Sequence, residues 1–167
     1  MPGVVSNASA LILLSGIGEF ARLQDLFGVV LITPQVYEEV VVRGKGKPGS
    51  AEVAGASFVQ SRSVMGANRI SGLQSRAHIA AGEASTIILA DELKADVVLI
   101  DEKAARESAR ELGLKVAGTM RVLELAFERK LIADLSATYR RLKAGSAHIS
   151  PALLNASLAR FQLPPIA

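Results

Sequence analysis

The chain of 167 residues contains no cysteine and no tryptophan, and only 4% of its residues are aromatic. Without cysteine, disulfide bonds and thiolate metal sites are excluded. So few aromatic rings argue against a protein that binds nucleic acid by stacking bases on an aromatic surface. The only histidines, His78 and His148, lie far apart in the sequence, so a zinc site is not expected either.

Long apolar runs are also missing. Runs such as 10–14 and 29–32 are far shorter than the roughly 18 residues that a membrane-spanning helix needs. The start, Met1-Pro2-Gly3, lacks the basic region of a signal peptide. We therefore expect a cytoplasmic protein with no membrane association.

The familiar phosphate-binding loops are absent from the sequence. Gly16-Ile17-Gly18 lacks the further glycine and the strand-to-helix setting of a dinucleotide loop, and no Gly-Lys-Ser/Thr loop occurs. An α/β protein that binds a small phosphorylated ligand therefore ranks lowest among the functions considered.

Half of the residues are hydrophobic, and the length suits one domain with a continuous core. Short apolar segments alternate with segments of helical periodicity. The predicted strands cover 4–5, 29–32, 58–64, 97–100 and 114–116. The predicted helices cover 10–14, 19–27, a segment opening at Thr33-Pro34, 81–94, 101–112 and 119–130. This alternation predicts an α/β fold with a mostly parallel sheet, whereas residues 44–77 form the least regular part of the chain.

The C-terminal segment has a pattern of its own. Ser150-Pro151 resembles a helix start, and Leu154, Leu158 and Phe161 follow at helical spacing. We therefore divide the chain into a domain over 1–145 and a helical tail over 146–167, which docks on the domain or on a partner chain.

The net charge of +3 and the isoelectric point of about 9.4 are compatible with a polyanionic partner. Basic residues recur in the middle of the chain and near its C-terminus, at Arg62, Arg69, Arg76, Arg140, Arg141 and Lys143. The simplest interpretation of such clusters is a solvated helix face.

Four polar positions fall where an α/β fold would bring them together: Asn7, Glu39, Glu83 and Asp101. Asn7 and Asp101 directly follow predicted strands, and ligands of parallel sheets bind beyond the carboxyl ends of the strands. Oxygen ligands of this kind suit a hard cation such as Mg²⁺ or Mn²⁺. Asn7 can offer an amide oxygen but brings no negative charge.

Each of these positions also has a structural interpretation. Asp101 and Asn7 could cap helices, and Glu83 lies in a first helical turn, where acids are favoured without any function. Glu39 could be an ordinary helical residue. The functional hypothesis therefore depends on the joint placement of all four.

Four blocks of the sequence resemble those of PIN domains. They are residues 4–12, 32–40, 82–90 and 98–102, the last followed by Arg106. The order and spacing of the blocks are similar to those of small prokaryotic PIN-like proteins, a DUF3368-like branch related to VapC-type toxin ribonucleases. The resemblance spans roughly residues 4–130 and implies a three-layer sandwich with helices on both sides of the sheet.

PIN domains are metal-dependent nucleases, and the resemblance implies a catalytic and metal-binding set of Asn7, Glu39, Glu83 and Asp101 with Mg²⁺ or Mn²⁺. Active members commonly carry Asp where this chain has Asn7, so one of four charges is absent. Three carboxylates favour one cation over two. The expected activity is therefore weakened.

The implied reaction is hydrolysis of an RNA phosphodiester. Many family members are toxins of toxin–antitoxin pairs, so the resemblance also implies an antitoxin protein as partner and a homodimer as assembly. Ser9 and Arg106 are the expected substrate-binding residues. Arg106 has a structural alternative, an ion pair with Glu102 one helical turn away. The alternative function is a PIN-fold nucleic-acid- or partner-binding protein that has lost catalysis.

Overall fold

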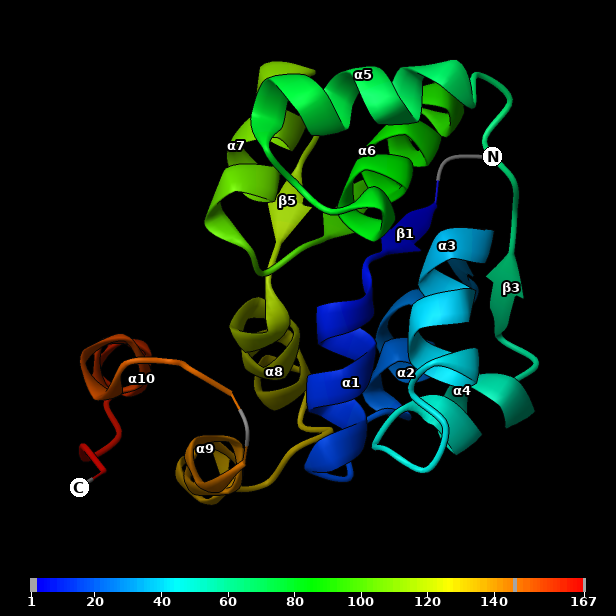
Figure 1. The fold of residues 1–167 in the computed structure, drawn as a ribbon. Helices are drawn as coiled ribbons and strands as arrows, with labels where there is room; N and C mark the ends of the chain where they lie inside the picture. Colours follow the sequence, from blue (N-terminus) through cyan, green and yellow to red (C-terminus); the bar gives the residue numbers. More distant parts are fainter. Residues whose placement is uncertain (1–2, 146, 167) are drawn as a thin grey trace.

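In a computed structural model, which describes residues 3–145 and 147–166, a five-stranded sheet lies between two layers of helices (Figure 1). The strand order is β3-β2-β1-β4-β5, and all neighbouring strands are parallel. The strands are β1 Val4–Ser6, β2 Val30–Ile32, β3 Val59–Ser61, β4 Val97–Leu99 and β5 Val116–Ala117. The prediction of an α/β sandwich with a parallel sheet is confirmed.

Adjacent residues of the central strands face opposite layers of the sandwich. Val4 of β1 packs into one hydrophobic cluster and Val5 into the other. In β4, Leu99 packs into the same cluster as Val4, and Val98 into the same cluster as Val5. Because side chains alternate across a strand, a continuous apolar run is what a strand buried on both faces requires.

One layer consists of α5 Asn68–Ala77, α6 Ala81–Leu93 and α7 Lys103–Glu111, at the top of Figure 1. The other face is covered by helices whose apolar residues join a larger cluster. These are α1 Ala8–Gly16, α2 Arg22–Phe27, α3 Pro34–Tyr37, α4 Ser50–Gly55, α8 Thr119–Glu128 and α9 Leu135–Ala144. Helix α3 continues directly into a π-helical segment, η1 Glu38–Val42.

The region predicted as least regular contains two helices, α4 and α5, besides β3. Helix α5 buries only Ile70 and Leu73, and its other positions are polar, glycine or alanine. Two buried residues give too weak a periodicity to indicate a helix. Contacts with α6 order this segment in the folded chain.

Two sequence signals for helix starts have different outcomes. Thr33 caps α3 by accepting a hydrogen bond from Val36 N, with Pro34 in the first turn, as predicted. Threonine is also common at helix caps, but Gly118 occupies the cap position of α8 and the first helical residue is Thr119. Its hydroxyl is used elsewhere, as described below.

The C-terminal helix α10, Pro151–Arg160, packs against α9. Ser150 caps it, and Leu154 and Leu158 are fully buried in the larger hydrophobic cluster. Residues 1–2, 146 and 167, at the ends of the two predicted units, lie outside the described residues. No helix in the described parts of the chain is long and apolar enough to cross a membrane.

Candidate active site

The candidate site lies at the carboxyl edge of the sheet, where β1 and β4 are neighbours. Ser6 pairs with Leu99, and Asn7 N donates a hydrogen bond of 2.9 Å to Leu99 O. Asn7 and Asp101 therefore leave the sheet at the same edge, as their positions after two strands predicted.

Asn7 occupies the N-cap position of α1, but its side chain makes no capping hydrogen bond. The residue is only 3% exposed, and its Oδ1 has no hydrogen-bond partner in the described chain. The simple helix-cap interpretation of Asn7 is therefore wrong. A buried amide oxygen without a donor is costly and calls for an explanation.

Gly82, at the start of α6, leaves space beside this oxygen. A Cβ atom at Gly82 would lie 2.9 Å from Glu39 Oε2 and 3.7 Å from Asn7 Oδ1. Glu39 reaches this point from η1, a π-helical turn of a kind that often occurs at functional sites. The structure thus brings Asn7 and Glu39 together above a residue without a side chain.

Glu83 follows Gly82 and accepts a hydrogen bond of 3.0 Å from Ala80 N, so it does serve as a helix cap. Burial raises the pKa of its carboxyl, and the negative charges of Glu102 and Glu39 raise it further, while the bond from Ala80 N opposes them. Three carboxylates therefore repel one another at this edge, an arrangement that a cation would relieve.

Asp101 is held by Thr119, the first residue of α8. Thr119 donates to both carboxylate oxygens, from its backbone N at 2.8 Å and from its hydroxyl at 2.7 Å. A Cβ atom at Gly118 would lie 2.8 Å from Asp101 Oδ1 and 2.7 Å from an Nη of Arg106. Asp101 is therefore fixed in orientation, and Arg106 lies beside it.

The alternative ion pair between Arg106 and Glu102 is not formed among the described side chains. Arg106 instead donates a hydrogen bond of 3.0 Å to Ile100 O. Burial lowers the pKa of its guanidinium, the charge of Arg110 lowers it further, and Asp101 has the opposite effect. Two guanidinium groups thus repel each other next to the acidic edge.

Within the described residues, no three Asp, Glu or His side chains form a group that could hold a metal ion. The site has two parts instead, Asn7 with Glu39 above Gly82 and Asp101 with Arg106 beside Gly118. All candidate ligands are oxygen atoms, which suits Mg²⁺ or Mn²⁺, and the unpartnered Asn7 Oδ1 fits a cation ligand. The residues present therefore fit one weakly bound cation better than a rigid chelate.

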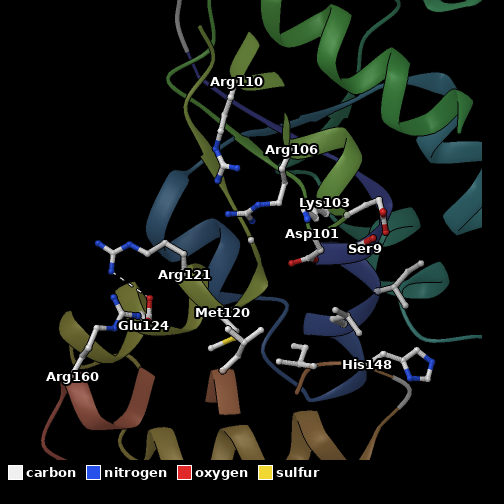
Figure 2. A pocket seen from close by; sticks show the side chains of 17 residues that line it. Ser9, Asp101, Lys103, Arg106, Arg110, Met120, Arg121, Glu124, His148 and Arg160 are labelled. Carbon is white, nitrogen blue, oxygen red and sulfur yellow. Dashed lines mark hydrogen bonds and ion pairs between the residues drawn. The ribbon is translucent and has the colours of Figure 1, made fainter. Parts of the chain in front are cut away.

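A pocket of about 770 Å³ opens next to Asp101 (Figure 2). Ser9 and Arg106, the expected substrate-binding residues, both line it. Helices α8 and α10 also contribute to its lining, including Met120 and Arg160. The pocket is thus continuous with one part of the acidic edge and extends away from it to the C-terminal helix.

A sequence-family model of the PIN domain, DUF3368, matches residues 3–162. The chain belongs to the PIN-domain family. The resemblance of the four sequence blocks is thereby confirmed, and the matched range includes α10. The PIN domain is a nuclease-type fold.

A comparison with curated proteins finds no match to this PIN domain. Among solved structures, it is similar to a PilT N-terminus domain protein from the hyperthermophilic archaeon Sulfolobus solfataricus P2. The two chains are 17% identical, with a TM-score of 0.47, over 77% of this chain and 95% of the other.

Several residues that shape the site of this PIN domain were not predicted from the sequence. Gly82 and Gly118 matter for the space they leave, and Thr119 matters as a donor to Asp101. The position of Thr119 after a predicted strand was a usable signal, because polar residues after parallel strands collect at one edge. Arg121 and Arg160 reach the pocket only through helix packing.

Proposed function

We propose that this PIN domain is a metal-dependent ribonuclease that hydrolyses RNA phosphodiesters. The observation that carries the proposal is Asn7 Oδ1, buried without a hydrogen-bond partner in the described chain and next to the Glu39 carboxylate above Gly82. An oxygen in that position lacks only a positively charged partner. Asp101, at the same edge of the sheet, borders a pocket with several arginine residues.

Glu39, Glu83, Asp101 and Asn7 would hold the cation, directly or through water. A bound Mg²⁺ or Mn²⁺ supplies Lewis-acid polarisation of a phosphate and lowers the pKa of bound water. The three carboxylates carry more negative charge than one divalent cation requires for neutrality, but less than two divalent cations would require. One cation is therefore the expected number.

The remaining residues act on the substrate. Arg106 is held by Ile100 O, which leaves other guanidinium N–H groups to bind a phosphate oxygen at the pocket. Thr119 keeps Asp101 in one orientation, because both carboxylate oxygens accept hydrogen bonds from it. Ser9 contributes a hydroxyl to the same pocket.

A second candidate function is binding of nucleic acid or a protein partner without catalysis. It is favoured by the amide at Asn7 and by the lack of any preformed group of three acidic or histidine ligands in the described chain. The two functions share the pocket and differ in whether bound RNA is cut.

A ribonuclease assay with Mn²⁺ or Mg²⁺ distinguishes them. We expect weak cleavage by the wild-type protein, faster cleavage by Asn7→Asp and none by Asp101→Asn. Glu111→Gln, which removes an exposed acid of α7 outside the site, is the matched control and should cleave like wild type.

Cleavage that persists in Asp101→Asn or in the presence of a chelator contradicts the proposal. If no variant cleaves RNA while RNA still binds with a steep salt dependence, the binding function takes its place.

A toxin role in the cytoplasm, with an antitoxin partner and a homodimeric assembly, belongs to the same proposal. An antitoxin segment with a basic side chain would complement the acidic edge around Glu39 and Glu83. Co-expression with a small protein from an adjacent reading frame should relieve growth inhibition if this role is correct. Inhibition that such a protein leaves unchanged contradicts it.

A further inference from the structure

The pocket beside Asp101 has two chemically different sides. Basic side chains from α7, α8 and α10 form an arc on one side, with Arg106, Arg110, Arg121 and Arg160 visible in Figure 2. Apolar side chains form the other side: Ile12, Leu13, Met120, Ile149 and Leu153. The volume of about 770 Å³ is within the range of small-ligand sites.

The arginine arc carries more positive charge than its surroundings neutralise. Arg106 and Arg110 both line the pocket and lie one helical turn apart on α7. Arg110 is exposed and makes no ion pair with any described residue. Two neighbouring guanidinium groups favour the binding of an anion between them, since Arg110 has no ion-pair partner among the described residues. The oxygen atoms of a phosphate match the hydrogen-bond geometry of the guanidinium groups.

The far end of the arc is held by a buried carboxylate. Glu124 is 2% exposed, accepts a hydrogen bond of 2.6 Å from Ser157 Oγ and pairs with Arg160. Arg121 lies 3.6 Å from its other oxygen. Glu124 therefore fixes α10 to α8 and positions Arg121 and Arg160 at the pocket.

We infer that this pocket is a subsite for one nucleotide of a single-stranded substrate, with its phosphate on Arg106 and Arg110 and its base against the apolar side around Met120. This rests on the proposed ribonuclease function, which places the cleaved bond beside Asp101. The described lining contains no Phe, Tyr or Trp side chain. Base contacts are therefore aliphatic, and discrimination among bases is weak.

The test is equilibrium binding of a short, labelled single-stranded RNA to the full-length protein in a chelator, so that no cleavage is required. Arg110→Gln should weaken binding about tenfold, since a charge-assisted hydrogen bond is lost. It should also reduce the slope of log K against log salt by about 0.7, the value for one phosphate contact on a single strand. Arg140→Gln removes the same charge from an exposed position on α9 outside the pocket and should change neither quantity.

Competition separates the nucleotide from its phosphate alone. Uridine monophosphate should displace the RNA at lower concentration than inorganic phosphate, and Met120→Ser should reduce that difference while it leaves competition by phosphate unchanged. Equal competition by both ligands in the wild-type protein overturns the inference, as does equal weakening by Arg110→Gln and Arg140→Gln.

The outcome for the subsite is independent of catalysis. Asp101→Asn should lose cleavage without weaker binding of RNA, because it removes a negative charge beside Arg106. If no variant cleaves RNA but Arg110→Gln and Met120→Ser have the expected effects on binding, only the ribonuclease proposal is refuted. If RNA is cleaved as expected but neither Arg110→Gln nor Met120→Ser changes binding, only the subsite is refuted.

Discussion

Asn7→Asp should destabilise the cation-free protein, and a bound cation should offset most of that loss. The side chain is 3% exposed, its Oδ1 lacks a donor in the described structure, and the Glu39 carboxylate shares the space above Gly82. The substitution keeps the shape but adds a buried negative charge beside an existing one. An uncompensated buried charge costs about 3 kcal/mol.

A cation should reverse that cost. Ligand binding at 100 times its dissociation constant stabilises the folded state by about 2.7 kcal/mol. Mn²⁺ at that level should therefore restore most of the stability that Asn7→Asp loses in a chelator. The wild-type protein should gain less at the same Mn²⁺ concentration, because its amide offers an oxygen without charge.

The pH dependence has a definite sign. Burial and the nearby acid raise the pKa of the introduced carboxyl in the folded state above its unfolded value of about 3.9. The penalty is absent below about pH 4, where the group is protonated in both states, and grows as the pH rises through the folded pKa. Urea denaturation in chelator should thus show equal stability of variant and wild type at pH 4 and a difference at pH 7.5.

Asn68→Asp is the matched control, because it makes the same change at an exposed position in the first turn of α5. It should alter stability by no more than about 0.5 kcal/mol at either pH. If Asn7→Asp behaves like this control, or if Mn²⁺ does not recover the lost stability, Asn7 does not lie in a desolvated cation site.

Three further predictions follow from the site and the tail. Glu83→Gln should stabilise the cation-free protein at pH 7.5 but not below about pH 4.5. Burial raises the pKa of the Glu83 carboxyl in the folded state, so its ionisation destabilises the fold only above the pKa of the unfolded chain. Urea denaturation at both pH values checks this. Gly118→Ala should cost about 1 to 3 kcal/mol, because the added Cβ displaces the Asp101 carboxylate from its hydrogen bonds with Thr119, and should lower kcat/KM for RNA by about 100-fold; unchanged kinetics would show that neither Asp101 nor Arg106 acts on the substrate. Leu158→Ala should cost about 2 to 5 kcal/mol in thermal or urea unfolding, because Leu158 is a fully buried residue through which α10 packs into the larger hydrophobic cluster; a smaller loss would show that α10 is only loosely attached.

Much of the fold could be predicted from local patterns. The continuous apolar runs at Val4-Val5 and Val97–Leu99 predicted strands buried on both faces, and the structure pairs them in parallel. The Thr33-Pro34 signal depends only on adjacent residues and correctly located the start of α3. Helix α5 could not be predicted in this way, because only two of its residues, Ile70 and Leu73, are buried.

For the site, the sequence alone determined which oxygen-bearing residues follow strands or begin helices, and hence that Asn7 and Asp101 lie at one edge of the sheet. That inference needs only the rule that parallel strands end on the same side. Only the tertiary structure decided that Asn7 Oδ1 has no hydrogen-bond partner among the described residues, that Thr119 donates hydrogen bonds to Asp101 and that Arg160 reaches the pocket. The physical reason is that hydrogen-bond partners and pocket walls come from segments far apart in the chain, whose relative positions are set by the packing of both hydrophobic clusters.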